Sequence, residues 1–99
     1  MGKNLIPVNK ILTTALKLVQ GKRAEQHGNY IDMHERVSAL WSAYLDIEVK
    51  SHQVAACMML LKLARDEYGI YNKDDGIDAT AYTALWASLT SMKRNRREQ

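Results

Sequence analysis

Apolar residues recur at spacings of three and four along most of this chain, which is the spacing of one face of an α-helix. The first such stretch predicts a helix over about 7–20, with Pro7 at its start and Gly21 at its end. The same periodicity predicts three further helices, over about 33–46, 52–68 and 76–93. No segment alternates apolar and polar residues with a period of two, so no β-sheet is expected.

Short connections between the predicted helices favour antiparallel neighbours. The sequence therefore predicts an all-α, single-domain, up-down-up-down four-helix bundle over residues 1–99. The third helix is apolar on every side between Val54 and Leu61, which indicates that other helices surround it. Cys57 lies in that stretch and is expected to be a buried small hydrophobic residue. The apolar stripes also place four aromatic residues in the core, namely Trp41, Tyr44, Tyr82 and Trp86.

The formal net charge is +3, and the positive charge is concentrated near the C-terminus. A basic tail at about 93–99 contains Lys93, Arg94, Arg96 and Arg97. These cations could face the negative end of the last helix dipole, or they could bind nucleic-acid phosphates weakly and with steep salt dependence. No stretch approaches the roughly 20 apolar residues that cross a bilayer, and no secretory signal is evident, so we expect a cytoplasmic protein without a membrane span.

The antiparallel arrangement would bring the ends of the first and third helices to the same pole as the starts of the second and fourth. Polar side chains that are distant in sequence would gather there: Lys22, Arg23, His27, Tyr30, Asp32, Glu35, Arg36, Lys62, Arg65, Tyr71, Asn72, Asp75 and Asp78. The carboxylates at 32 and 35, like those at 75 and 78, have the spacing of a capping box. The two pairs could alternatively meet and hold a divalent cation such as magnesium.

Lys62 and Arg65 interrupt the most apolar predicted helix, three residues apart. Cations at such positions either extend to the rim of the core or pair with a buried anion. Asp75 or Asp78 could neutralise them, or all four side chains could hold a ligand, and the sequence does not distinguish these networks. The three histidines lack the spacing of a zinc site, and His27 followed by glycine predicts a turn.

The chain resembles a family of small bacteriophage and prophage proteins in three segments: HGNYIDMHERVSALWSAYL, VAACMMLLKLARDEYG and NKDDGIDATAYTAL. The resemblance covers about residues 27–89, and its matching positions are His27, Gly28, Arg36, Leu40, Trp41, Ser42, Tyr44, Leu45, Lys62, Ala64, Arg65, Asn72, Asp78 and Tyr82. Ala81 departs from the family pattern, which usually has glycine there. The resemblance implies a phage-derived helical protein, and a looser likeness to phage domains associated with nucleotide modification implies nucleotide handling.

The first functional hypothesis is an accessory protein that binds a nucleotide or another phosphate ligand at the polar end of the bundle. The residues that would bind it are His27, Arg36, Lys62, Arg65, Asp75, Asp78 and Tyr82. Binding is favoured over catalysis because no nucleophile or general base can be named, and no catalytic residue, metal ligand or cofactor is assigned. If the protein were an enzyme, a metal-dependent nucleotide hydrolase with magnesium would be the first choice.

The second hypothesis belongs to a different class of protein, a non-enzymatic factor that docks on a phage or host macromolecule. Weak DNA binding through the basic tail is a further alternative. A homodimer would suit a bundle of this size, because the core of so small a domain is marginal. The expected location is the cytoplasm of the bacterial host.

Overall fold

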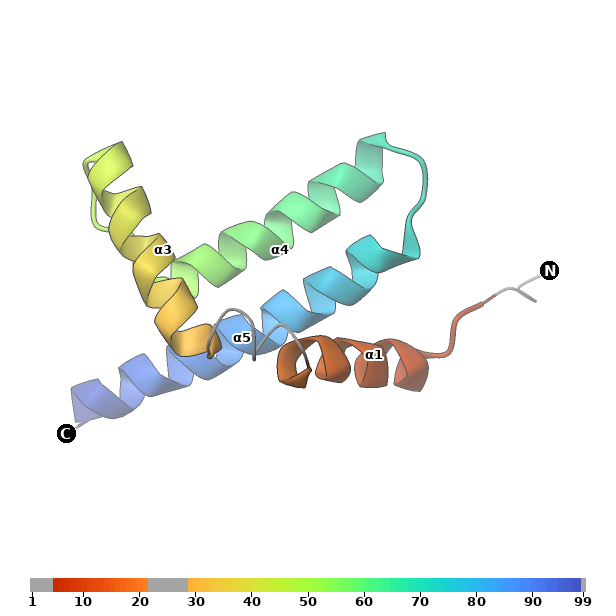
Figure 1. Cartoon of the computed structure of the whole chain (residues 1–99), viewed down its shortest axis with the longest axis horizontal. Helices are drawn as coiled ribbons and strands as arrows, with labels where there is room; N and C mark the ends of the chain where they lie inside the picture. The colour runs from red at the N-terminus through yellow and green to blue at the C-terminus, as the bar shows by residue number, and fades with distance from the viewer. Residues whose placement is uncertain (1–4, 22–28, 99) are drawn as a thin grey trace.

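The structure is a computed structural model that describes residues 5–21 and 29–98, with the side chains of residues 68 and 93–98 outside the description. The described chain forms the helices α1 (Val8–Gln20), α3 (Tyr30–Leu45), α4 (Ser51–Tyr68) and α5 (Lys73–Glu98), and contains no strand (Figure 1). The prediction of an all-α helical bundle is confirmed. The last helix continues through the positions that the sequence suggested as a tail.

Two asparagine residues explain why α3 and α5 begin earlier than the sequence predicts. Asn29 Oδ1 accepts a hydrogen bond from the backbone N–H of Asp32 at 2.9 Å. Asn72 Oδ1 likewise accepts from the backbone N–H of Asp74 at 2.9 Å. Capping boxes that begin at Asp32 and Asp75 were therefore the wrong prediction, because both carboxylates lie inside the first turn. The Asp32 carboxylate accepts a hydrogen bond from Nδ2 of Asn29 at 3.2 Å, whereas the Asp75 carboxylate faces Arg65 on α4.

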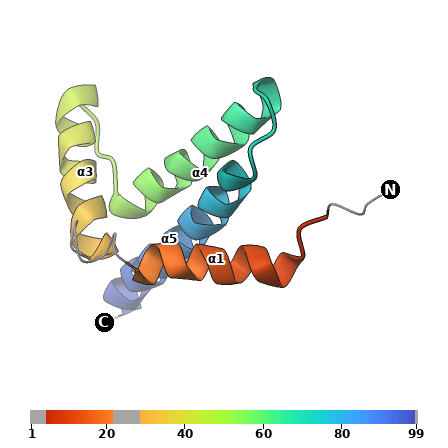
Figure 2. The same cartoon turned by 45° about the vertical axis from the view of Figure 1, so that its right-hand side comes forward.

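The bundle is built on an antiparallel hairpin of α4 and α5, with α1 packed across α5 and α3 packed against α4 (Figures 1 and 2). Small side chains such as Ala55 and Ala79 are buried in the hairpin, where they let two helix backbones approach closely. The core between α1 and α5 consists of Ala15, Ile77 and Ala81, with Ile11, Leu18 and Val19 around it. No helix of the described ranges is both long and apolar enough to cross a membrane.

Hydrogen bonds near its two ends fix the direction of α3. Ser42 Oγ accepts from the backbone N–H of Val49 at 2.8 Å and donates to the carbonyl oxygen of Val49 at 3.1 Å. At the opposite end, the hydroxyl groups of Tyr30 and Ser88 are hydrogen-bonded at 2.9 Å, which joins α3 to α5. With these attachments, α3 crosses the start of α4 and then diverges from it (Figures 1 and 2).

Several apolar residues that the sequence predicted in the core are exposed. Cys57 is exposed on α4, and Tyr44 and Trp86 are 88% and 40% exposed, whereas Trp41 and Tyr82 are half-buried. The expectation that other helices surround α4 was also wrong, since only one side of this helix is buried. Among the described helices, α5 and α3 make the main contacts with α4.

Candidate functional site

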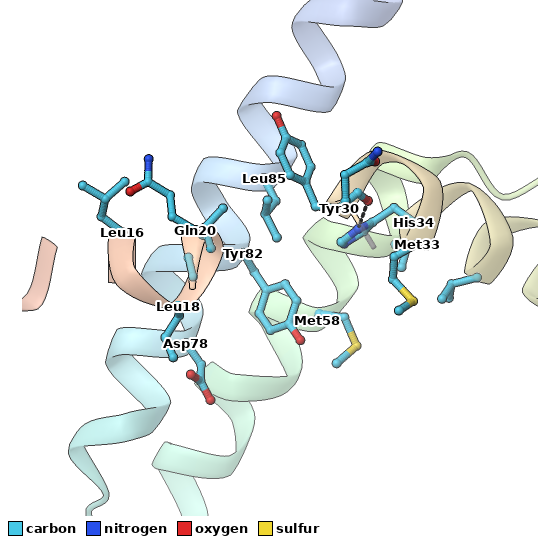
Figure 3. Close-up of a pocket in the computed structure, with 15 residues that line it drawn as sticks. Leu16, Leu18, Gln20, Tyr30, Met33, His34, Met58, Asp78, Tyr82 and Leu85 are labelled. Atoms are coloured by element: carbon cyan, nitrogen blue, oxygen red, sulfur yellow. Dashed lines mark hydrogen bonds between the residues drawn. The ribbon is translucent and has the colours of Figure 1, made fainter. Parts of the chain in front are cut away.

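A cavity of about 860 Å³ lies where all four described helices approach one another (Figure 3). Its walls are mostly apolar, formed by Leu16, Leu18, Val19, Met33, Val37, Val54, Met58, Ala81 and Leu85. A few polar side chains complete the lining: Gln20, Asn29, Tyr30, His34, Asp78 and Tyr82. Its size and its mixture of apolar walls with few polar groups are typical of a small-molecule site.

Asp78 on α5 supplies the acidic group of the described cavity lining. Its Oδ2 lies 3.1 Å from Lys62 Nζ on α4, and the two side chains are 19% and 15% exposed respectively. The Asp78 carboxylate is therefore paired with an ammonium group and also belongs to the lining of the cavity. Tyr82, one turn further along α5, lies between Asp78 and the methionine Met58 (Figure 3). The fold thus places a charged acceptor next to an aromatic ring.

A second ion pair lies one turn away, at the end of the same hairpin. Arg65 Nε is 4.0 Å from Asp75 Oδ1, and the Asp75 side chain is only 8% exposed, whereas that of Arg65 is 56% exposed. The antiparallel arrangement therefore brings Lys62 and Arg65 to the two aspartates, as the sequence suggested. Arg65 keeps most of its surface accessible to solvent.

The predicted site residues divide into three groups. Asp78 and Tyr82 line the cavity, Lys62 is paired with Asp78, and Arg65 and Asp75 form the second ion pair, one turn away from the first. Arg36 is exposed on α3 and is separate from the cavity lining. His27 lies outside the described residues, as do the side chains of Lys93, Arg94, Arg96 and Arg97.

Sequence reasoning missed His34, which is 6% exposed and lines the cavity. Its Nδ1 is 2.8 Å from the carbonyl oxygen of Tyr30. A carbonyl oxygen only accepts, so Nδ1 carries a proton, and in the neutral ring Nε2 is left as an acceptor. The signal in the sequence was the helical spacing of His34 with Tyr30 and Trp41, which places all three on the inner side of α3.

The magnesium site suggested by the two acidic pairs does not form within the described part of the chain. No three side chains of histidine, cysteine, aspartate or glutamate gather there as metal ligands. Asp75 and Asp78 instead face Arg65 and Lys62. Ion pairing between the two helices of the hairpin therefore explains Asp75 and Asp78.

The fold and the cavity define this molecule as a small helical protein with a largely apolar cavity, and comparison with known proteins gives its family. Residues 10–90 match a domain of unknown function, DUF6378, and the chain belongs to that family. The Gene 55 protein of Mycobacterium phage L5 is 38% identical over 76 residues, which cover 76% of this chain and 49% of that protein. The Gene 55 protein of Mycobacterium phage D29 is 32% identical over 72 residues, covering 73% and 48%.

The chain thus spans about half the length of these curated relatives. No solved structure gives a significant match. The resemblance to small phage proteins is confirmed, and the chain is a phage-derived helical protein. The likeness to nucleotide-modification domains stays a prediction.

Proposed function

We propose that this protein binds a nucleotide through the cavity, with the nucleobase inside and the phosphate groups toward the end of the α4–α5 hairpin. The observation that carries the proposal is the position of Asp78, a carboxylate beside Lys62 at the wall of an otherwise largely apolar cavity. A nucleobase has two apolar faces and a polar edge with amino or imino donors. A carboxylate accepts hydrogen bonds from that edge, as it does from the amino group of cytosine in other complexes.

The residues near Asp78 support a planar ligand. Tyr82 is four residues further along α5, so its ring lies one helical turn away on the same side of the helix. Base–aromatic stacking contributes about 1–3 kcal/mol per base in other proteins. Met33 and Met58 offer adaptable apolar contacts on the other walls. The cavity therefore combines an aromatic face, flexible apolar walls and one charged acceptor.

Arg65 is the group that would contact phosphate. Its guanidinium is 4.0 Å from Asp75 and its side chain is 56% exposed, so most of its donors are accessible. A guanidinium binds phosphate oxygens with two parallel hydrogen bonds. Lys62 lies one turn before it but is already paired with Asp78. We assign the protein a binding role, because no nucleophile with an adjacent base is found among the described residues of the cavity lining.

A thermal-shift screen of nucleosides, nucleoside monophosphates and triphosphates, with and without magnesium, tests this function. A ligand at 100 times its Kd stabilises the folded state by about 2.7 kcal/mol, so the Tm should rise by about 10–20 °C. Asp78→Asn and Tyr82→Leu should each reduce the rise, measured against the Tm of each variant without ligand. Asp66→Asn, at an exposed position of α4, is the matched control. The proposal fails if no compound raises the Tm of the wild type.

Deleting residues 93–99 separates this function from DNA binding by the tail. We expect the nucleotide-dependent rise in Tm to survive the deletion, because the buried residue Leu89 is retained. Any affinity for duplex DNA should fall, since four cations are lost, with a salt slope reduced by up to about 3.6. Fluorescence anisotropy over a salt series measures this. Loss of nucleotide binding together with DNA binding would contradict the assignment of the site to the cavity.

A further inference from the structure

The side of α4 that faces away from α5 is apolar and exposed. Cys57, Leu60 and Ala64 recur there at spacings of three and four, the spacing of a coiled-coil seam. Leu60 is 57% exposed, and its neighbours Leu61 and Leu63 are 47% and 54% exposed. No aspartate, glutamate, lysine or arginine occurs between residues 51 and 61. This outer face therefore resembles a helix–helix contact without its partner.

The apolar stripe of α3 is covered along only half of its length. Met33, Val37, Leu40 and Tyr44 follow one another at spacings of four, three and four. The first two line the cavity, whereas Leu40 and Tyr44 are 69% and 88% exposed. The divergence of α3 from α4 explains the difference, because none of the other described helices lies beside the second half of α3 (Figures 1 and 2).

The total exposed area agrees with a missing partner. The chain exposes 7677 Å², whereas a monomeric protein of 11.3 kDa exposes about 5,700 Å². The excess of about 2,000 Å² is within the range that one subunit of an obligate homodimer loses on association, roughly 1,000–2,500 Å². The radius of gyration of 15.2 Å also exceeds the value of about 12.6 Å expected for a compact chain of this length.

The core that is buried among the described residues is small. Among the described residues, seven apolar side chains are buried, and four of them are alanines: Ala15, Ala55, Ala79 and Ala81. A partner that enlarges this core would stabilise the folded chain. A second copy of the chain is such a partner, and the stabilisation it gives rises with protein concentration.

We propose that the outer face of α4 pairs with the same face of a second copy of this chain, in a two-fold symmetric dimer. An antiparallel pairing centred on Leu60 brings the two Leu60 side chains together and sets Cys57 between the levels of Leu63 and Ala64 of the partner subunit. Gln53 then lies opposite Glu67 of the partner subunit, so no like charges meet. Leu40 and Tyr44 border this interface from α3. The proposal is independent of nucleotide binding.

The molar mass of the full chain in solution tests the dimer directly. Light scattering after size exclusion should give twice 11.3 kDa at micromolar concentrations. Leu60→Glu should raise the dimer dissociation constant by about 100-fold or more, because a two-fold interface contains the substitution twice. Thr13→Glu places the same charge at an exposed polar position of α1 and should leave the dimer intact. A monomeric mass for the wild type overturns the proposal.

Cross-linking tests the pairing of the two α4 helices. Leu60→Cys in a Cys57→Ser background should yield a disulfide-linked dimer with oxidised glutathione, since a two-fold axis at this position brings the two Cα atoms within about 7 Å. Thr13→Cys in the same background is the control and should stay unlinked. A dimeric mass without cross-linking at position 60 would show that another face mediates association, and the proposed interface would be wrong. Circular dichroism of each variant verifies that it is folded.

Discussion

Truncation of Leu89 to alanine is expected to lower the free energy of unfolding by about 3 kcal/mol and the Tm by about 15 °C. Leu89 is 2% exposed, and only Val54 and Ile77 accompany it as buried apolar residues larger than alanine in the described helices. The substitution removes buried methyl groups and leaves a cavity that a helix–helix contact refills only in part. In so small a core, one leucine is a large fraction of the total stability.

The control for this prediction is the same truncation at Leu5, which is 80% exposed. Leu5→Ala should change the free energy of unfolding by no more than about 0.5 kcal/mol. Urea denaturation followed by circular dichroism gives both values, with all proteins at one concentration so that association contributes equally. Equal losses for the two variants would show that burial at position 89 does not determine the stability.

The helices were predictable because each carries an apolar stripe of helical period. Val8–Gln20 and Ser51–Tyr68 lie within one residue of the predicted bounds. The starts of α3 and α5 were missed for a specific physical reason. Asn29 and Asn72 cap these helices, whereas the sequence offered aspartates with capping-box spacing a few residues later. Asparagine and aspartate cap a helix with the same kind of hydrogen bond, so the sequence pattern alone does not show which of them precedes the first helical residue.

The ion pair between Lys62 and Asp78 was predictable from the topology of the helices, whereas the cavity next to this pair was not. Antiparallel α4 and α5 bring residues at these positions to the same level of the hairpin. The cavity beside them depends on how α1 and α3 are placed against that hairpin. The spacing of apolar residues along a sequence does not determine the angles between helices. The sequence therefore tested His34 only as a metal ligand and did not predict its position in the cavity lining.

Exposure was the property that the sequence predicted least well. An apolar stripe shows which side of a helix avoids water but does not identify what covers it. Leu60 and Tyr44 have the spacing of core residues and are nevertheless exposed in the single chain. If a second copy covers them, the sequence pattern describes the dimer rather than one chain. In that dimer, the apolar residues of α3 and α4 that are exposed in one chain would be removed from water, as the core residues already are.

Asp78→Ala is expected to lower the free energy of unfolding by about 2 kcal/mol, because it leaves the Lys62 ammonium, only 15% exposed, without its partner. The loss is smaller than the roughly 3–5 kcal/mol of a fully buried broken pair, since solvent still screens both groups. Lys62→Met removes the cation and should cost less. The double variant should lose less than the sum of the single losses, with a coupling of about 1–2 kcal/mol. Urea denaturation of the four proteins measures it.

The exposed pair of Lys50 and Glu48 is the control for this cycle, with 3.7 Å between the charged atoms and side chains 41% and 78% exposed. Its coupling should stay below about 0.5 kcal/mol. A similar coupling in both cycles would show that burial does not strengthen the Lys62–Asp78 pair. The double variant also separates stability from binding, because it removes the cavity carboxylate while relieving the unpaired charge. If Asp78 contacts a nucleobase, the double variant should be folded and yet show no nucleotide-dependent rise in Tm.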